Sequence, residues 1–102
     1  MPEGGPTGNG APFDAIGSIP CATVRGQPTH ACLFGVIREG PGNAGVWIAT
    51  GDGEERHILF EGNVPVDSDS GSDISYEVEI DLFLIRIGPE RYEIPGAVVN
   101  GG

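Results

Sequence analysis

Glycine, proline and aspartate interrupt this chain so often that no window is long enough to hold a typical α-helix. Between them lie short apolar runs, in which isoleucine and valine supply 18 of the 26 leucine, isoleucine, valine and phenylalanine residues. β-Branched side chains suit a pleated, half-buried surface. The sequence therefore predicts an all-β fold, an antiparallel meander of about six or seven short strands that forms a curled sheet or small barrel. We expect strands over residues 13–19, 32–38, 45–50, 56–61, 74–80, 82–88 and 91–95.

The composition changes near residue 11. Residues 1–11 hold four glycines and two prolines, and no apolar side chain there is larger than that of Met1. We expect this segment to be a flexible leader. Residues 12–102 are predicted to form a single β domain. Its expected core consists of Phe13, Ile16, Ile19, Phe34, Val36, Val46, Ile48, Ile58, Phe60, Ile85, Ile87, Tyr92 and Ile94.

The segment LFLIRIGPERYEIP is the clearest hairpin. One register places Arg86 opposite Glu93, with Pro89 at the second position of a type I turn. The alternative, a two-residue loop at Gly88–Pro89, places Arg86 opposite Arg91. Like charges directly opposed are unfavourable, so charge pairing favours the first register.

A second hairpin is expected in GVWIATGDGEERHILF, turning around Asp52 and Gly53. A two-residue Asp-Gly loop would set Ile48 against His57. A longer loop lets Val46 and Ile48 share a face with Ile58 and Phe60, and this arrangement is preferred.

Cys21 and Cys32 are the two cysteines of the chain. A structural zinc site normally takes four ligands in closely spaced pairs, and a thiol redox motif has the spacing Cys-x-x-Cys. His30 and His57 could complete a zinc set, but His30 lies only two residues from Cys32, and no activating base marks a nucleophilic cysteine. The preferred interpretation is a disulfide, which would stabilise so small a domain by roughly 3 kcal/mol. It implies an oxidising compartment, so we expect a periplasmic or secreted protein.

The ten residues between the cysteines, ATVRGQPTHA, are a candidate binding loop. A closed, proline-containing loop loses less entropy on binding than a free one. Arg25 would suit a trypsin-like pocket, with Gln27 and His30 beside it. The simpler interpretation is a stapled crossover whose arginine is solvated.

The segment VDSDSGSDIS is a weaker candidate, for calcium, through Asp67, Asp69 and Asp73. Its spacing fails the EF-hand pattern, so a solvated acidic loop is the preferred interpretation. The chain also lacks a nucleophile elbow and a phosphate-binding loop. We therefore expect no catalytic residue, metal or cofactor.

The charge is strongly one-sided, with 15 carboxylates against five arginines and a formal net charge of −10. Such a chain repels nucleic acid and anionic lipid. It has no apolar run long enough to insert into a membrane. The expected partner is a basic protein of the cell envelope, and the chain is expected to be a monomer.

The segments IPCA, GQP with the second cysteine, FGVIR, RHILFEGN and LIRIGPERYEIPGAVVNGG together resemble a family of small exported bacterial domains of unassigned function. The resemblance covers nearly all of residues 13–102. It implies export and a disulfide-bonded β domain, sometimes joined to other modules, and it implies no catalytic or binding residues.

The expected function is therefore that of an exported, non-enzymatic β module that acts by protein or ligand contact in the cell envelope. The alternative is an acidic inhibitor of a basic or trypsin-like hydrolase. Such an inhibitor would use either Arg25 in the Cys21–Cys32 loop or the acidic face. Glu77 and Glu79 are expected on an exposed polar face of the strand at residues 74–80.

Overall fold

The computed structural model describes residues 12–50 and 53–101, which form one antiparallel sheet and one short helix. The elements are β1 (Ala15–Ala22), β2 (His30–Arg38), β3 (Ala44–Ala49), β4 (Glu55–Glu61), β5 (Val64–Ser68), β6 (Ile74–Glu79), β7 (Leu82–Ile87), β8 (Glu90–Pro95) and α1 (Gly96–Asn100). The all-β prediction is confirmed, and each of the predicted strands overlaps an observed one. The predicted leader, residues 1–11, lies outside the described residues.

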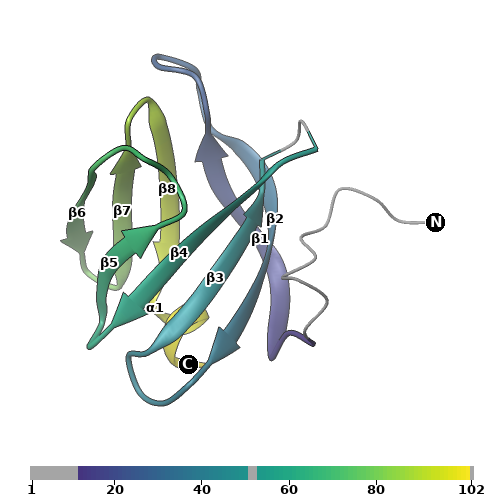
Figure 1. Ribbon diagram of the computed structural model, residues 1–102, viewed down its shortest axis with the longest axis vertical. Coiled ribbons are helices and arrows are strands. Elements are labelled where there is room, and N and C mark those ends of the chain that lie inside the picture. Colours follow the sequence, from purple (N-terminus) through teal and green to yellow (C-terminus); the bar gives the residue numbers. More distant parts are fainter. Residues whose placement is uncertain (1–11, 51–52, 102) are drawn as a thin grey trace.

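The strands follow the order β5-β4-β3-β2-β1-β8-β7-β6, and all neighbours pair antiparallel. The pairing of β1 with β8 joins the two halves of the meander. Figure 1 shows the sheet curling until its two edge strands, β5 and β6, lie on the same side of the molecule. The result is a nearly closed barrel with one unpaired seam.

Alternate side chains of each strand point into the barrel, as the period of two requires. These inward residues form the core: Ile19, Cys21, Cys32, Phe34, Val36, Ala44, Val46, Ile48, Ile58, Phe60, Phe83, Ile85, Ile87, Tyr92 and Ile94, with Val98 and Val99 from α1. Two predicted core residues are wrong: Phe13 packs against Trp47 outside the core cluster, and the side chain of Ile16 is 75 % exposed. It lies an odd number of residues from the buried Ile19, so it faces outward.

The short helix α1 was not predicted. It buries Val98 and Val99 against one end of the barrel. Arg38 of β2 holds it in place, because Nε donates to the carbonyl oxygen of Val98 at 3.1 Å and Nη2 to that of Ala97 at 3.4 Å. A guanidinium at a helix C-terminus satisfies carbonyl groups that have no partner within the helix.

The predicted register of the last hairpin is wrong. In the structure Ile85 lies opposite Tyr92, and Arg86 lies opposite Arg91. Both registers keep the same side chains inside, because they differ by two residues. Turn geometry decides instead: Gly88 has φ +59°, as the first position of a two-residue type II′ turn requires. The register of the β3–β4 hairpin agrees with the preferred longer loop, with Val46 opposite Ile58.

Candidate functional site

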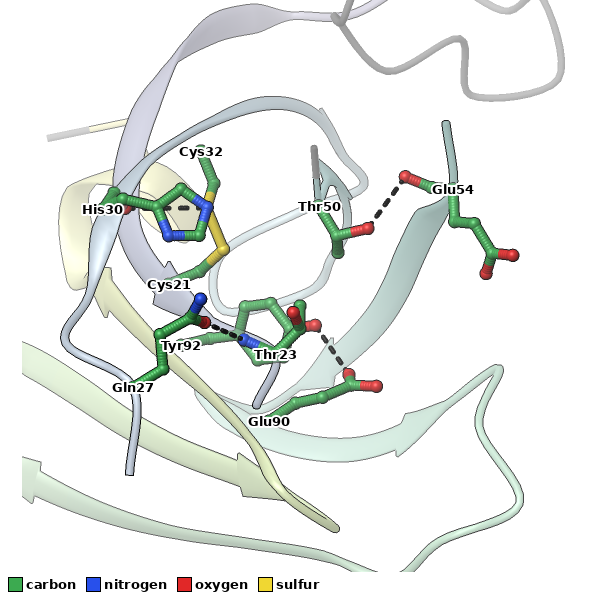
Figure 2. The surroundings of a disulfide bond; sticks show 9 residues. All are labelled: Cys21, Thr23, Gln27, His30, Cys32, Thr50, Glu54, Glu90 and Tyr92. Atoms are coloured by element: carbon green, nitrogen blue, oxygen red, sulfur yellow. Dashed lines mark hydrogen bonds between the residues drawn. A yellow bond between two sulfur atoms is a disulfide. The ribbon is translucent and has the colours of Figure 1, made fainter. Parts of the chain in front are cut away.

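The disulfide between Cys21 and Cys32 is confirmed and belongs to the core. The Cα atoms lie 5.9 Å apart, and the two residues are 0 % and 2 % exposed. It joins neighbouring strands diagonally, because Cys21 lies opposite His30 and Cys32 lies opposite Ile19. Figure 2 shows the His30 ring beside this bond.

The ligand atoms of Cys21, His30 and Cys32 lie within 4.8 Å of one another. Strand pairing explains this approach, since Cys21 and His30 are opposite each other and His30 and Cys32 share a face of β2. The two sulfur atoms are bonded to each other, so neither is a thiolate. In this oxidised state the cluster is a covalent staple, which is the interpretation that the sequence favours.

Residues 23–29 of the candidate binding loop connect β1 to β2, and His30 is the first residue of β2. Arg25 and His30 are exposed, whereas Gln27 is half-buried and its Oε1 accepts a hydrogen bond from the backbone N–H of Thr23 at 3.3 Å. Gln27 also donates its own N–H to the carbonyl oxygen of Val24 at 3.1 Å. Gln27 therefore shapes the loop, and Arg25 is the side chain that the loop presents.

Two of the three aspartates of the calcium candidate have separate roles. Asp67 Oδ1 accepts from the N–H of Ser68 at 2.9 Å, and Asp69 Oδ1 accepts from Arg56 Nη1 at 2.8 Å. Within residues 12–50 and 53–101, Asp67, Asp69 and Asp73 do not form a cluster of potential metal ligands. Asp69 is instead part of an ionic network.

That network spans the barrel interior and was not foreseen from the sequence. Arg56 of β4 donates Nε to Glu90 Oε1 at 2.8 Å and Nη2 to Glu90 Oε2 at 2.7 Å. Tyr92 of β8 donates its hydroxyl to Glu90 Oε1 at 2.6 Å, a bond that Figure 2 shows next to the disulfide. With Asp69 these residues form the cross-barrel network, which links strands on opposite walls. Bidentate pairing of this kind is strong because its geometry is fixed.

The environment shifts the pKa values of the network in the directions that pairing predicts. Burial alone would raise the pKa of Glu90, but the hydrogen bonds from Arg56 and Tyr92 outweigh it, so that pKa lies below its ordinary value. Burial, followed by the bond to Glu90, raises the pKa of Tyr92. Next to the network, burial lowers the pKa of His57, whose ring lies 4.4 Å from that of Trp47, despite the opposing effect of Asp69 and Asp67.

Acid should therefore destabilise the fold in two stages. Because the pKa of His57 is lower in the folded chain, the unfolded chain binds more protons than the folded chain once the pH falls below about 6.5. The lowered pKa of Glu90 has the same effect below about pH 4.5. Both contributions stabilise the fold at pH 7 and are lost as the pH falls through the folded-state pKa values. Urea unfolding of the wild type and of Glu90→Gln between pH 7 and pH 3 measures this. The variant should lose less stability below pH 4.5, and a flat wild-type profile would contradict the assignment.

The open seam between β5 and β6 is the second unusual feature. We define it by four exposed side chains, Val66 of β5, Tyr76 and Val78 of β6, and Ile80 of the following turn. Tyr76 and Val78 lie opposite the inward-facing Ile85 and Phe83, so they belong to the inner face of the sheet. They are nevertheless 40 % and 54 % exposed, because no strand pairs with the free edge of β6.

Ile80 has an unfavourable backbone conformation. Its φ is +56° and its side chain is 102 % exposed. A β-branched residue in the left-handed region is a genuine outlier, costing roughly 1–2 kcal/mol. Such strain concentrates at functional sites, where a side chain is kept for another reason than stability.

Replacing Ile80 by glycine should therefore raise stability. Glycine is the favoured first residue of a two-residue turn of this kind. The net gain should be about 1 kcal/mol, which corresponds to a rise in Tm of about 4–8 °C in a domain of this size. Val24→Gly is the control, because Val24 is also exposed (58 %) but is not among the positive-φ residues that the structure describes. Calorimetry that finds Ile80→Gly no more stable than the wild type would contradict the strain.

The outer face of β6 is acidic. Glu77 and Glu79 are both exposed and alternate with the apolar seam residues Tyr76 and Val78. The free edge of β6 therefore has one apolar side and one negatively charged side.

Comparison with known proteins adds no functional assignment. No protein-family model, curated protein or solved structure matches this chain. Among the described residues, no helix is long and apolar enough to cross a membrane.

Proposed function

We propose that this chain is an exported, non-enzymatic binding module that accepts an extended segment of a partner protein along the free edge of β6. The observation that carries the proposal is the exposure of Tyr76 and Val78, two apolar side chains on the inner face of the barrel. Soluble sheets usually cover or charge their edges, because a free edge offers unpaired N–H and C=O groups to other chains.

An added strand would satisfy both sides of this edge. Its backbone would bond to β6, and its alternate side chains would face either the apolar seam or the outer surface. Glu77 and Glu79 select for basic residues on the outer side, while Tyr76 and Val78 select for apolar residues on the inner side. The expected ligand is therefore a strand of alternating apolar and basic residues.

A second copy of this chain fits the edge poorly. Antiparallel pairing of β6 with β6 about a two-fold axis would bring glutamates of the two copies close together. Like charges opposed across strands are destabilising. The same acidity that disfavours self-pairing favours a basic partner.

The buried disulfide supports export. A disulfide of this kind forms and persists in an oxidising compartment. The stapled domain is then expected to meet its partner in the periplasm or outside the cell.

The test uses a short synthetic peptide of alternating valine and lysine, with a valine–glutamate peptide as the charge control. The wild type should bind only the basic peptide, and binding should weaken as salt rises. Val78→Asn should weaken binding about tenfold, because it removes the contact of one apolar side chain. Val24→Asn is the matched control, since Val24 is as exposed as Val78 but lies in the β1–β2 loop. Equal affinity for both peptides, or equal effects of the two variants, would contradict the proposal.

One observation favours a second candidate, inhibition of a trypsin-like hydrolase. Arg25 is exposed on a loop that a buried disulfide closes. Inhibition by loop insertion should persist at high salt and disappear in Arg25→Ala. Binding at β6 has the opposite pattern, because it depends on salt and not on Arg25.

A further inference from the structure

Two arginines face each other on the outer surface of β7 and β8. Arg86 and Arg91 are directly opposed in the register, and they lie on the other face of the sheet from Tyr92 of the cross-barrel network. Directly opposed like charges destabilise a sheet. The arrangement is more unexpected in a chain that has 15 carboxylates for five arginines.

Neither arginine has a salt-bridge partner among the described residues. Arg38 and Arg56, by contrast, bond to helix carbonyls and to carboxylates. The Nε and Nη2 atoms of Arg91 are also buried without an acceptor. Buried donors in folded proteins almost always have a partner, and an unpaired one calls for an explanation such as a bound ion.

A shallow hollow lies beside these groups. Its volume is about 150 Å³, and it is lined by Leu84, Ile85, Arg86, Arg91, Tyr92 and Glu93. Ile85 and Tyr92 have side chains that are 0 % exposed inside the barrel, so their backbone forms the floor. The volume corresponds to about five water molecules, which is enough for one small oxyanion.

We propose that this hollow binds a doubly charged tetrahedral oxyanion, a phosphate or sulfate group, between Arg86 and Arg91. Guanidinium groups present paired donors that match the oxygens of such anions. A dianion would neutralise both charges, remove their repulsion and supply the missing acceptor. Glu93 on the rim and the net charge of the chain oppose binding, so the site should be selective for dianions and sensitive to salt. This site is independent of the open seam.

The first test is a titration of the full chain with inorganic phosphate, followed through the arginine Nε–H signals by NMR. Phosphate should shift the signals of Arg86 and Arg91 saturably and leave that of Arg25 unchanged. Sodium chloride at the same ionic strength should not reproduce the shifts. Equal responses to chloride, or shifts that do not saturate, would overturn the proposal.

The second test uses Arg86→Gln, because Arg86 is exposed and its replacement should not affect folding. The variant should bind phosphate at least about tenfold more weakly, and it should be more stable than the wild type in low salt without phosphate. Glu93→Gln should strengthen phosphate binding. If Glu93 is instead the acceptor for Arg91, Glu93→Gln will lower stability without strengthening phosphate binding, and the proposal fails.

The bound phosphate or sulfate group could be a free ion or part of a larger molecule. Parallel titrations with inorganic phosphate, inorganic sulfate and a phosphate monoester distinguish these two sources. Tighter binding of the monoester than of either inorganic ion would indicate a group carried on a larger molecule. Tighter binding of an inorganic ion would indicate the free anion. Failure of all three would overturn the site and leave strand addition at β6 unaffected.

Discussion

Replacing both Cys21 and Cys32 by alanine should lower the free energy of unfolding by about 3–5 kcal/mol. The bond closes a loop between residues separated by 11 positions. Without it the unfolded chain gains conformational entropy, which stabilises the unfolded state by roughly 3 kcal/mol. The rest comes from packing, since both residues are almost completely buried in the core. Small domains have total stabilities of only about 5–15 kcal/mol, so the effect is a large share.

Urea unfolding of the oxidised wild type and of the double alanine variant measures the difference. Dithiothreitol should not change the midpoint of the variant, which has no disulfide left to reduce. A difference below about 1 kcal/mol between wild type and variant would show that the staple has no structural importance.

Replacing Glu90 by glutamine should lower the free energy of unfolding by about 3 kcal/mol. The change removes the charge that pairs with Arg56, whose side chain is only 19 % exposed and would keep Asp69 as its remaining ionic partner. A cation that loses its bidentate partner in such a place is costly, because burial weakens its hydration. The corresponding fall in Tm is about 12–24 °C.

Two further variants show that the loss comes from the lost pairing of Arg56 with Glu90. Glu79→Gln, on the exposed face of β6, should change stability by less than about 0.5 kcal/mol. The double variant Arg56→Met with Glu90→Leu should recover much of the loss, because apolar residues can replace a buried ion pair at little cost. A Glu90→Gln variant as stable as Glu79→Gln would contradict the role of the cross-barrel network.

The sequence was sufficient to predict the strands that alternate regularly and the disulfide. Predictions from the sequence are wrong where the local backbone geometry departs from a general rule. Strand β5 was missed because Pro65 interrupts its pattern, although an edge strand tolerates proline. The last hairpin has a different register from the one that charge pairing predicts, because the geometry of the turn at Gly88 decides it. The two opposed arginines that result line the proposed oxyanion site, as conflicts between local rules and structure often mark functional sites.

The cross-barrel network joins Arg56 and Glu90, which are 34 residues apart in the sequence. No local sequence pattern indicates that two residues so far apart in the sequence are in contact. A signal was nevertheless present, because Arg56 alternates in phase with Ile58, and Glu90 alternates in phase with Tyr92. Two opposite charges in phase with core residues indicate an ion pair that is at least partly buried.

The open seam can be identified only from the order of the strands in the sheet. The exposed acidic face of β6 was expected from Glu77 and Glu79, and the structure confirms their exposure. The sequence does not show that β6 ends the sheet, because strand order depends on the long-range pairing of β1 with β8. Only that order reveals that the inner face of β6 is uncovered.

Hydrogen exchange of the backbone amides of β6, measured by NMR with and without the valine–lysine peptide, tests strand addition most directly. Alternate amides of β6, those on its free edge, should become protected when the peptide binds, while protection in the β1–β2 loop stays unchanged. Intermolecular contacts from the peptide valines should reach Tyr76 and Val78. Binding that leaves the β6 amides unprotected, or that protects the loop around Arg25, would contradict strand addition at this edge.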